Sequence, residues 1–462
     1  MITRNIRTIT SSGKSGESLV VPGWIRTVRD SKNIVFISLN DGSNIKGLQI
    51  VVDKDHFNNP DVLQQLSVGC AIVAKGVLQN SIGQGQSLEL LCSEIKMEGI
   101  SPEDYPLQKK RHTLEYLREI AHLRPRTNTI GAVERVRSRM AYAIHNFFQE
   151  RGFVYVHTPI ITASDCEGAG EMFNVTTLDA EALPRTKDGK VDFERDFFGK
   201  KAYLTVSGQL EGETYAMAMG NIYTFGPTFR AENSNTKRHL AEFWMIEPEM
   251  AFCDINDNME VAESFLKYIF KDVIEHCSED MDFFDSFVEK GVKKTLLHVI
   301  ETPFVHMTYT DAIKELEKNN DAFNFKVKWG CDIQTEHERF LTEEVAHSPV
   351  IVTDYPKAIK SFYMKENEDG QTVRGMDVLV PRLGEIIGGS EREADYTKLL
   401  ARIKELGLDE KNYSWYLDLR KYGSCTHSGF GLGFERAILY ATGMQNIRDV
   451  IPYPRYVRSA EF

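Results

Sequence analysis

Alternating apolar and polar residues, interrupted by short polar turns, run through residues 17–97. The pattern predicts five strands, at 19–28, 33–39, 45–52, 71–78 and 88–92. One short helix is expected at 61–66, and a glycine-containing hairpin loop at 81–86. Five short strands within about 80 residues are typical of a small closed β-barrel, and we expect an OB-type fold here.

A helical pattern with a continuous apolar stripe replaces the strands after residue 127. The stripe runs along residues 128–151 and consists of Ile130, Val133, Val136, Met140, Ile144, Phe147 and Phe148. This spacing predicts one amphipathic helix. Its apolar face either packs on the chain's own sheet or forms a seam between two subunits, and the pattern leaves both open. Residues 99–127, with three prolines and a basic run at 109–111, indicate a hinge.

The next strands carry the first candidate site. A strand is expected at 153–157, and residues 221–252 form two strands joined by a polar loop at 232–239. Alternation in the second strand places one set on a single face: Phe243, Met245, Glu247, Glu249 and Ala251. The opposite face is apolar and suits a core: Trp244, Ile246, Pro248, Met250 and Phe252. Two carboxylates and a ring on the other face therefore predict a site there.

The remainder of the chain mixes helices and strands, so the fold class is α+β. Amphipathic helices are expected at 258–271 and 309–318, and helices at 413–417 and 433–442. Further strands are expected at 350–353, 358–364, 375–380, 385–387 and 427–432. We divide the chain into a barrel at 1–98, a linker at 99–127 and a larger domain at 128–462. Two stretches, at about 180–200 and 275–345, are expected to be variable, the second as an insertion.

Composition narrows the class of protein. The chain has 462 residues and a formal charge of −12, with no run of about 18 apolar residues and no signal-like start. Seven cysteines without a Cys-x-x-Cys pair argue against a disulfide framework or a zinc site. We therefore expect a cytoplasmic protein without membrane contacts. Residues 1–140 carry +5 and the rest −17, which hints at a polyanionic partner of the basic end.

Several charged residues suggest phosphate chemistry. The glycine-rich segment 429–436 does not match the dinucleotide-binding fingerprint, and the chain has no P-loop. Arg436 at a helix start and Arg230 at a strand end are candidate phosphate ligands. For each alone a surface arginine without a ligand is the more common explanation, in a tight strand–helix turn for Arg436 and in an ion pair for Arg230. Asp377 and Glu385, on neighbouring strands, suit Mg²⁺ bound with phosphates, or else structural salt bridges.

Three segments in this order resemble motifs 1, 2 and 3 of the class II aminoacyl-tRNA synthetases: residues 153–159, 226–232 and 429–436. The N-terminal barrel places the resemblance in the aspartyl, asparaginyl and lysyl subgroup. Three more segments are most similar to the asparaginyl enzymes: residues 166–173, 242–249 and 384–392. The resemblance implies an antiparallel sheet flanked by helices, ATP-dependent activation of L-asparagine and its transfer to the 3′-terminal adenosine of tRNA(Asn), in a homodimer.

The resemblance also implies a role for each site residue. The residues that would bind ATP are Arg230, Glu232, His239, Phe243 and Arg436, of which Arg230 and Arg436 are catalytic. Asp377 and Glu385 would hold Mg²⁺. The amino acid would be bound by Glu167, Gln209, Glu247 and Arg392. The anticodon would meet Arg26, Arg29, Phe36 and Gln49 on the barrel, where a core position for Phe36 is the alternative.

Two positions favour asparagine over aspartate. Aspartyl enzymes carry a shorter Asp at the position of Glu247 and a lysine at the position of Gly212. In this chain the carboxylate at position 247 therefore extends further toward the substrate side chain, and position 212 places no cation beside it. Gly388 replaces a serine found in many archaeal-type aspartyl enzymes, which leaves the metal one protein ligand fewer. The alternatives are a nondiscriminating aspartyl-tRNA synthetase and a catalytically silent synthetase-like RNA-binding protein.

Overall fold

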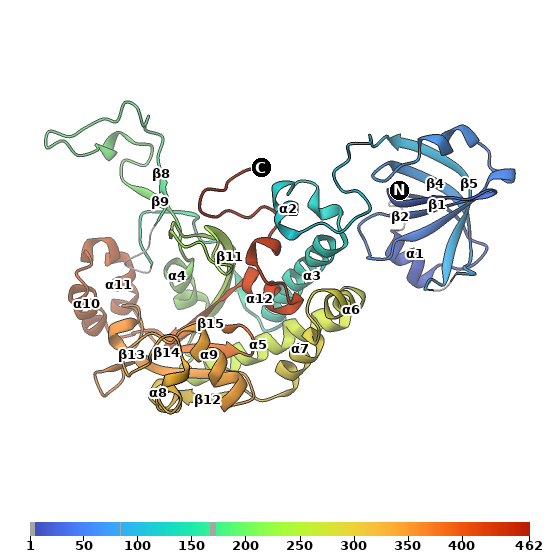
Figure 1. The fold of residues 1–462 in the computed structure, drawn as a ribbon. Coiled ribbons are helices and arrows are strands. Elements are labelled where there is room, and N and C mark those ends of the chain that lie inside the picture. Colours follow the sequence, from blue (N-terminus) through green and yellow to red (C-terminus); the bar gives the residue numbers. More distant parts are fainter. Residues whose placement is uncertain (1–4, 84, 167–171) are drawn as a thin grey trace. The chain divides into compact units, whose positions relative to one another are not determined.

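The computed structural model describes residues 5–83, 85–166 and 172–462 and forms two compact units (Figure 1). One unit comprises residues 1–136, 277–283 and 462, and the other comprises residues 137–276 and 284–461. Helix α3 (Asn128–Glu150), predicted from its stripe, contributes residues to both. The functional division at residues 98 and 127 stays a prediction.

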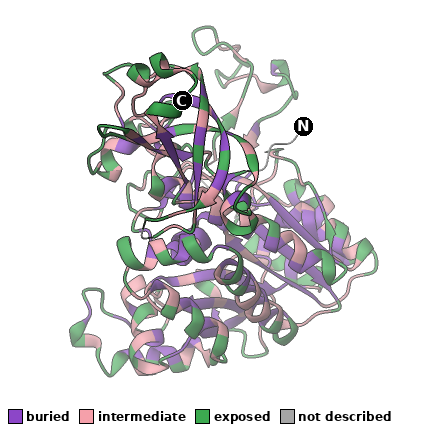
Figure 2. Cartoon of the chain, turned by 90° about the vertical axis from the view of Figure 1, so that its right-hand side faces the viewer, coloured by how far each residue is buried: buried purple, intermediate pink, exposed green. Residues whose placement is uncertain are grey.

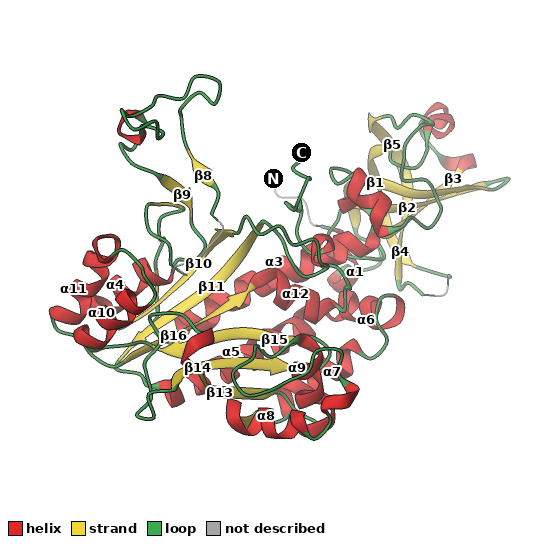
Figure 3. Cartoon of the chain, turned by 60° about the vertical axis from the view of Figure 1, so that its left-hand side comes forward, coloured by secondary structure: helices red, strands yellow, loops and turns green. Residues whose placement is uncertain are grey.

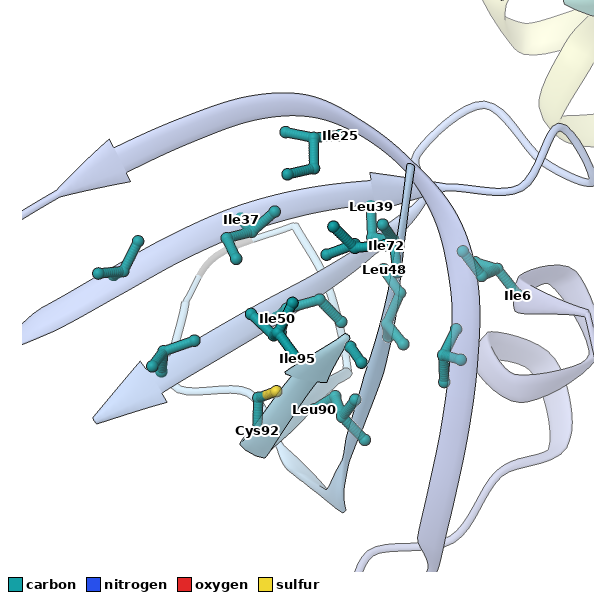
Figure 4. Close-up of a cluster of buried hydrophobic side chains, with 14 of the residues drawn as sticks. Ile6, Ile25, Ile37, Leu39, Leu48, Ile50, Ile72, Leu90, Cys92 and Ile95 are labelled. Carbon is teal, nitrogen blue, oxygen red and sulfur yellow. The ribbon is translucent and has the colours of Figure 1, made fainter. Parts of the chain in front are cut away.

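The first unit contains the predicted barrel. Its strands close in the order β1 (Ser18–Asp30), β2 (Ile34–Asn40), β3 (Leu48–Asp53), β5 (Leu88–Gly99) and β4 (Ala71–Asn80). Alternate residues such as Ile37 and Ile50 are fully buried inside, together with Ile6 of α1 (Ile6–Ser12) (Figure 4). The expected short helix is a 3₁₀ helix, Pro60–Gln65, and α2 (Leu114–Glu119) follows the barrel. The five-stranded OB-type barrel is confirmed.

The second unit is built on an eight-stranded sheet (Figure 3). Its order is β12 (Val305–Thr308), β13 (Val350–Pro356), β14 (Thr372–Val380), β15 (Gly384–Glu391), β16 (His427–Gly433), β11 (Glu242–Ala251), β10 (Asn221–Phe229) and β6 (Val154–Tyr155). All neighbours are antiparallel except the pairs at the two edges, β12–β13 and β6–β10. A separate small sheet contains β7 (Ile161–Thr162), β9 (Ala202–Leu204) and β8 (Asn174–Val175).

Helices flank this sheet and bury its strands (Figure 2). They are α4 (Gln209–Met219), α5 (Ile255–His276), α7 (Val292–Glu301), α8 (Tyr309–Glu317), α9 (Thr335–Phe340), α10 (Tyr396–Glu405), α11 (Ser414–Lys421) and α12 (Phe434–Thr442), and α6 (Ser278–Phe287) precedes α7. Helix α4 contacts β10 and β11, and α5 contacts β14, β15 and β16. Within the described ranges, no helix combines the length and apolar character that a membrane crossing needs.

The apolar stripe of α3 is buried within the single chain. All seven of its residues are at most 1% exposed. Phe148 stacks on Tyr223 of β10 with ring centroids 4.6 Å apart, and it lies 4.8 Å from the ring of Phe265 on α5. Of the two alternatives for this stripe, the structure therefore supports packing on the chain's own sheet rather than a subunit seam.

Two local predictions were wrong, and one predicted strand is shorter than expected. Residues 358–364 form a 3₁₀ turn (Lys357–Ile359) and a loop rather than a strand, because Phe362 and Tyr363 are both buried consecutively against α10 and α11 instead of alternating. The strand expected at 153–157 is paired only over Val154–Tyr155. Phe252 lies beyond the end of β11 and is 82% exposed, so it is not a core residue.

Candidate active site

The polar face of β11 lines two adjoining cavities of about 340 and 300 Å³. Phe243 lies on the first, Glu247 and Glu249 lie on the second, and Met245 lines both. Arg230 and Glu385 also line both cavities, so these two residues stand at their junction. The predicted sharing of one strand face by the ring and the carboxylates is therefore confirmed.

The first cavity is bounded by three arginines, Arg230, Arg238 and Arg436. Arg436 lies in the first turn of α12, and its Nη1 donates to the Glu385 carbonyl oxygen at 3.2 Å. The Arg230 guanidinium lies 5.5 Å from the centroid of the Phe243 ring. Two arginines more than 200 positions apart in sequence thus converge on one cavity. A concave site with three guanidinium groups is suited to a polyanion such as a triphosphate.

The loop between β10 and β11 supplies the remaining predicted residues of this cavity. Glu232 and His239 both line it, and both are exposed. His239 Nδ1 lies 2.5 Å from the Thr236 hydroxyl oxygen, which holds the ring within the loop. Arg238 of the same loop donates to Thr335 of α9 at 2.9 Å and so connects the loop to the predicted insertion.

Two carboxylates converge beside these arginines. A Cβ built on Gly388 would lie 3.3 Å from Glu385 Oε1 and 3.5 Å from Asp377 Oδ1, so both oxygens face the open space over this glycine. Asp377 Oδ2 accepts a hydrogen bond from Lys360 Nζ at 2.8 Å. Oxygen donors that converge next to a polyanion site fit a hard cation such as Mg²⁺. Substrate oxygens would complete the shell of such an ion.

Glu338 of α9 is a third carboxylate at this position, and sequence reasoning missed it. It accepts a hydrogen bond from the backbone N–H of Glu385 at 3.1 Å. Burial, together with the nearby Glu385 carboxylate, raises the pKa of Glu338 to about 7. The residue lies in the stretch that we expected to be an insertion without a motif, and only the fold brings it to β15.

The second cavity contains a buried ion pair between Arg392 and Glu249. Arg392 is 3% exposed, its Nε donates to Glu249 Oε2 at 3.2 Å, and its Nη1 donates to Ser390 at 2.8 Å. Burial acts to raise the pKa of Glu249, whereas the Arg392 guanidinium, which donates to both carboxylate oxygens, acts to lower this pKa and favours the ionised carboxylate of the pair. The structure therefore brings Arg392 together with Glu249, whereas we expected Glu247 to face the substrate beside it.

The Glu247 carboxylate is hydrogen-bonded by other groups of the protein. It accepts hydrogen bonds from the Ser207 hydroxyl, from the Gly208 N–H at 2.9 Å and from the Thr224 hydroxyl at 3.0 Å. It thus anchors the loop that leads into α4 and Gln209. Gly212 is buried, and a Cβ there would be in van der Waals contact with Ile222 Cδ1 at 3.4 Å and with Glu249 Cγ at 3.9 Å. Glu167, the other predicted ammonium ligand, lies outside the described residues.

The barrel carries a polar patch on its outer face. Arg29 and Phe36 are cross-strand partners on β1 and β2, with the guanidinium 4.8 Å from the ring centroid. Gln49 of β3 pairs with Ser38 on the same face and donates to Glu89 at 3.2 Å. Phe36 is thus not a core residue. Arg26 does not join this patch, because it lies at a β-bulge in β1 and is partly buried, which lowers its pKa.

Comparison with known families agrees with this arrangement. Residues 113–457 match the family described as tRNA synthetases class II (D, K and N), and residues 19–98 match the OB-fold nucleic acid binding domain. The chain belongs to the class II aminoacyl-tRNA synthetases of this group.

Relatives place it more narrowly. The asparagine–tRNA ligase of Treponema denticola is 61% identical, over 99% of each chain, and that of Acetivibrio thermocellus is 62% identical, over 97% of this chain and 96% of the relative. The structure is also similar, with a TM-score of 0.86 and 31% identity over the full length of both chains, to the crystal structure of asparaginyl-tRNA synthetase from Pyrococcus horikoshii complexed with asparaginyl-adenylate. Within the class, the chain belongs to the asparagine–tRNA ligase family.

The raised pKa of Glu338 predicts a pH-dependent contribution to stability. Between pH 4.5 and about 7 the folded protein retains a proton on Glu338 that the unfolded chain has released, so this group lowers the stability as the pH rises through that window. Glu338→Gln should therefore gain stability relative to the wild type, by on the order of 2 kcal/mol, between pH 4.5 and pH 8. Chemical denaturation at several pH values measures the difference. Glu317→Gln, at an exposed position of α8, is the matched control. A constant difference for Glu338→Gln would contradict the prediction.

Proposed function

We propose that this chain is an asparagine–tRNA ligase that uses ATP to convert L-asparagine to asparaginyl-adenylate and transfers the asparaginyl group to the 3′-terminal adenosine of tRNA(Asn). The observation that carries this function is the convergence of Arg230 and Arg436 on one cavity, joined at Arg230 to a second cavity that contains Arg392. The reaction takes place in the cytoplasm and needs no membrane partner.

The two cavities suit the two substrates of the activation step. The substrate carboxylate attacks the α-phosphorus of ATP, and pyrophosphate leaves, so the protein positions the substrates and stabilises charge. Arg230, at the junction, neutralises the α-phosphate, while Arg436 meets the γ-phosphate. Phe243 stacks on the adenine, Glu232 accepts from its amino group, and His239 reaches the phosphates from the loop.

Asp377 and Glu385 would hold Mg²⁺ in this site, as their convergence over Gly388 supports. The ion would supply positive charge to the phosphate oxygens and so assist their orientation. Lys360 contributes a fixed positive charge beside Asp377 at 2.8 Å. Glu338 holds the backbone of Glu385 in place through the hydrogen bond that it accepts from the Glu385 N–H.

The second cavity binds the amino acid. Gln209, with Glu167, takes the ammonium group, and Arg392 donates to the side-chain carbonyl oxygen of asparagine. Arg392 and Glu249 form a pair without net charge, so the carboxylate of aspartate finds no uncompensated cation there, whereas a neutral amide enters without adding charge. Glu247 shapes the cavity through the loop that it anchors, and Gly212 supplies no second cation.

ATP–pyrophosphate exchange with purified protein tests the activity and its substrate. We expect exchange with asparagine and at least about 100-fold slower exchange with aspartate, because a buried extra charge costs several kcal/mol. Arg436→Ala should lower the asparagine rate about 100- to 1,000-fold, since it removes charge stabilisation of the leaving phosphates. Equal rates with both amino acids would indicate a nondiscriminating aspartyl enzyme. No exchange with either would indicate a silent RNA-binding protein.

The barrel patch of Arg29, Phe36 and Gln49 is proposed to bind the anticodon. A half-buried ring beside a guanidinium suits stacking of an unpaired base, and the glutamine can read its edge. Arg26, which is partly buried, is proposed to act only near the loop phosphates.

Phe36→Ala should raise the KM for tRNA(Asn) about 10- to 100-fold in aminoacylation, because stacking of one base on an aromatic ring contributes about 1–3 kcal/mol. The ATP–pyrophosphate exchange rate should not change, since the barrel does not contact the small substrates in the proposal. Ile82→Ala, at a 98% exposed position of the β4–β5 loop, is the control. An unchanged KM for tRNA would show that the anticodon binds elsewhere.

The homodimer is proposed to form through the β6 edge of the sheet. Val154 and Tyr155 on this edge strand are 37% and 44% exposed, and Tyr142 on the outer side of α3 is 55% exposed. Apolar side chains beside an unpaired strand edge are typical of an interaction surface.

Tyr155→Arg should convert the dimer to a monomer, because a buried unpaired charge would oppose association. Light scattering during gel filtration should give about twice the chain mass of 52.6 kDa for the wild type and 52.6 kDa for the variant. Tyr422→Arg, also exposed but outside this edge, should remain dimeric. A monomeric wild type would exclude the dimer.

A further inference from the structure

Gln209 is held from behind by a carboxylate one helical turn away. Glu213 lies four residues further along α4 and is fully buried. The Gln209 side-chain nitrogen donates to Glu213 Oε1 at 3.0 Å. An ionised carboxylate only accepts hydrogen bonds, so the Gln209 amide must present its NH₂ to Glu213 and its oxygen to the other side. None of the described residues donates to that oxygen, and Gln209 lines the second cavity.

Glu213 is fixed in turn by donors from α11 and β16. It accepts from the Tyr416 hydroxyl at 2.7 Å and from Arg420 Nη2 at 2.8 Å, and His427 Nε2 lies 3.1 Å from it. Arg420 is itself held by the Glu393 carbonyl oxygen at 2.8 Å. Burial alone would raise the pKa of Glu213, but Arg420 and His427 outweigh it and lower the pKa. The carboxylate is therefore ionised and has one orientation.

The same carboxylate also reaches the other end of the amino-acid cavity. Arg392 Nε lies 3.9 Å from Glu213 Oε1, on the side of the guanidinium that also donates to Glu249. Glu213 therefore faces both the residue proposed for the ammonium group and the residue proposed for the side-chain amide. Its charge, with that of Glu249, balances the charges of Arg392 and Arg420 within the buried group.

We propose that Glu213 is a positioning residue for amino-acid binding, which turns the Gln209 amide so that its oxygen accepts a hydrogen bond from the substrate ammonium group and which steadies Arg392 for the side-chain amide. This inference rests on the proposed function. It states that Glu213, which does not line the cavity, determines which end of the Gln209 amide faces the cavity. A test of the proposal must therefore reverse the hydrogen bond in which residue 209 donates and residue 213 accepts.

Glu213→Gln changes this direction, since a glutamine at position 213 can present its own NH₂ to Gln209 and turn the Gln209 oxygen away from the cavity. We expect the KM for asparagine in ATP–pyrophosphate exchange to rise about 10- to 100-fold, the loss of one hydrogen bond to a charged group. The KM for ATP should stay within about twofold. Should this variant not fold, Glu213→Asp, which keeps the charge but withdraws it by one methylene, should raise the same KM about fivefold.

A reversed pair provides the sharper test. In Gln209→Glu alone, two buried carboxylates face each other, and exchange should fall. In the double variant Gln209→Glu with Glu213→Gln, the amide introduced at position 213 donates to the carboxylate introduced at position 209, whose second oxygen accepts from the ammonium group. Its KM for asparagine should be at least about fivefold lower than that of either single variant, a coupling that mere loss of packing does not give.

Tyr416→Phe is the control for a structural effect, because it removes one donor to Glu213 without touching Gln209. It should lower Tm and leave the KM for asparagine within about twofold of the wild type. A wild-type KM in Glu213→Gln, or a double variant no better than the single ones, would overturn the proposal. Failure of the proposed function is distinguishable, since wild-type protein would then show no exchange with asparagine at all.

Discussion

Three buried carboxylates on one side of the sheet must each be matched by donors, and much of the larger unit follows from this constraint. Glu213, Glu247 and Glu249 are all at most 6% exposed, and removing an unpaired charge from water costs far more than any single contact returns. Glu247 is satisfied by the loop before α4, Glu249 by Arg392, and Glu213 by α11 and β16. The donors come from segments far apart in sequence, so the charges tie these segments together around the second cavity.

The glycine-rich strand of motif 3 gains a physical explanation from the same constraint. Gly429 on β16 is paired with Glu249 on β11, and a Cβ at Gly429 would overlap the Glu249 carboxylate. Glycine is therefore needed there to make room for a neighbouring side chain, rather than to bring the backbone close to a phosphate. Gly388 serves a similar purpose on β15, where it leaves open the space onto which Asp377 and Glu385 converge. The glycines are therefore explained by the space that neighbouring side chains on the sheet need, as much as by a ligand.

The strongest sequence signals were periodic or anchored in a motif, and they were the reliable ones. The barrel strands, α3 and the polar face of β11 followed from spacing, because an element with one face buried repeats its apolar residues at a fixed interval. Residues 358–364 failed, because a loop buried on several sides has no period to read. The spacing placed Glu249 on the correct face of its strand. It did not predict the ion pair with Arg392, because the spacing within one strand does not show which residue of another segment lies opposite. Glu213 was within reach, as it lies one turn after Gln209.

The amino-acid sequence by itself determined the class of fold, the order of its elements, the family and the two arginines that line the first cavity, because local periodicity and motif residues are properties of neighbouring positions. Only the tertiary structure decided which carboxylate meets Arg392, that Glu338 of the expected insertion reaches β15, that Arg26 lies partly buried at a bulge, and that the α3 stripe is covered by its own chain. These are pairings between distant segments, and they depend on register, burial and charge compensation, which no stretch of the chain contains alone.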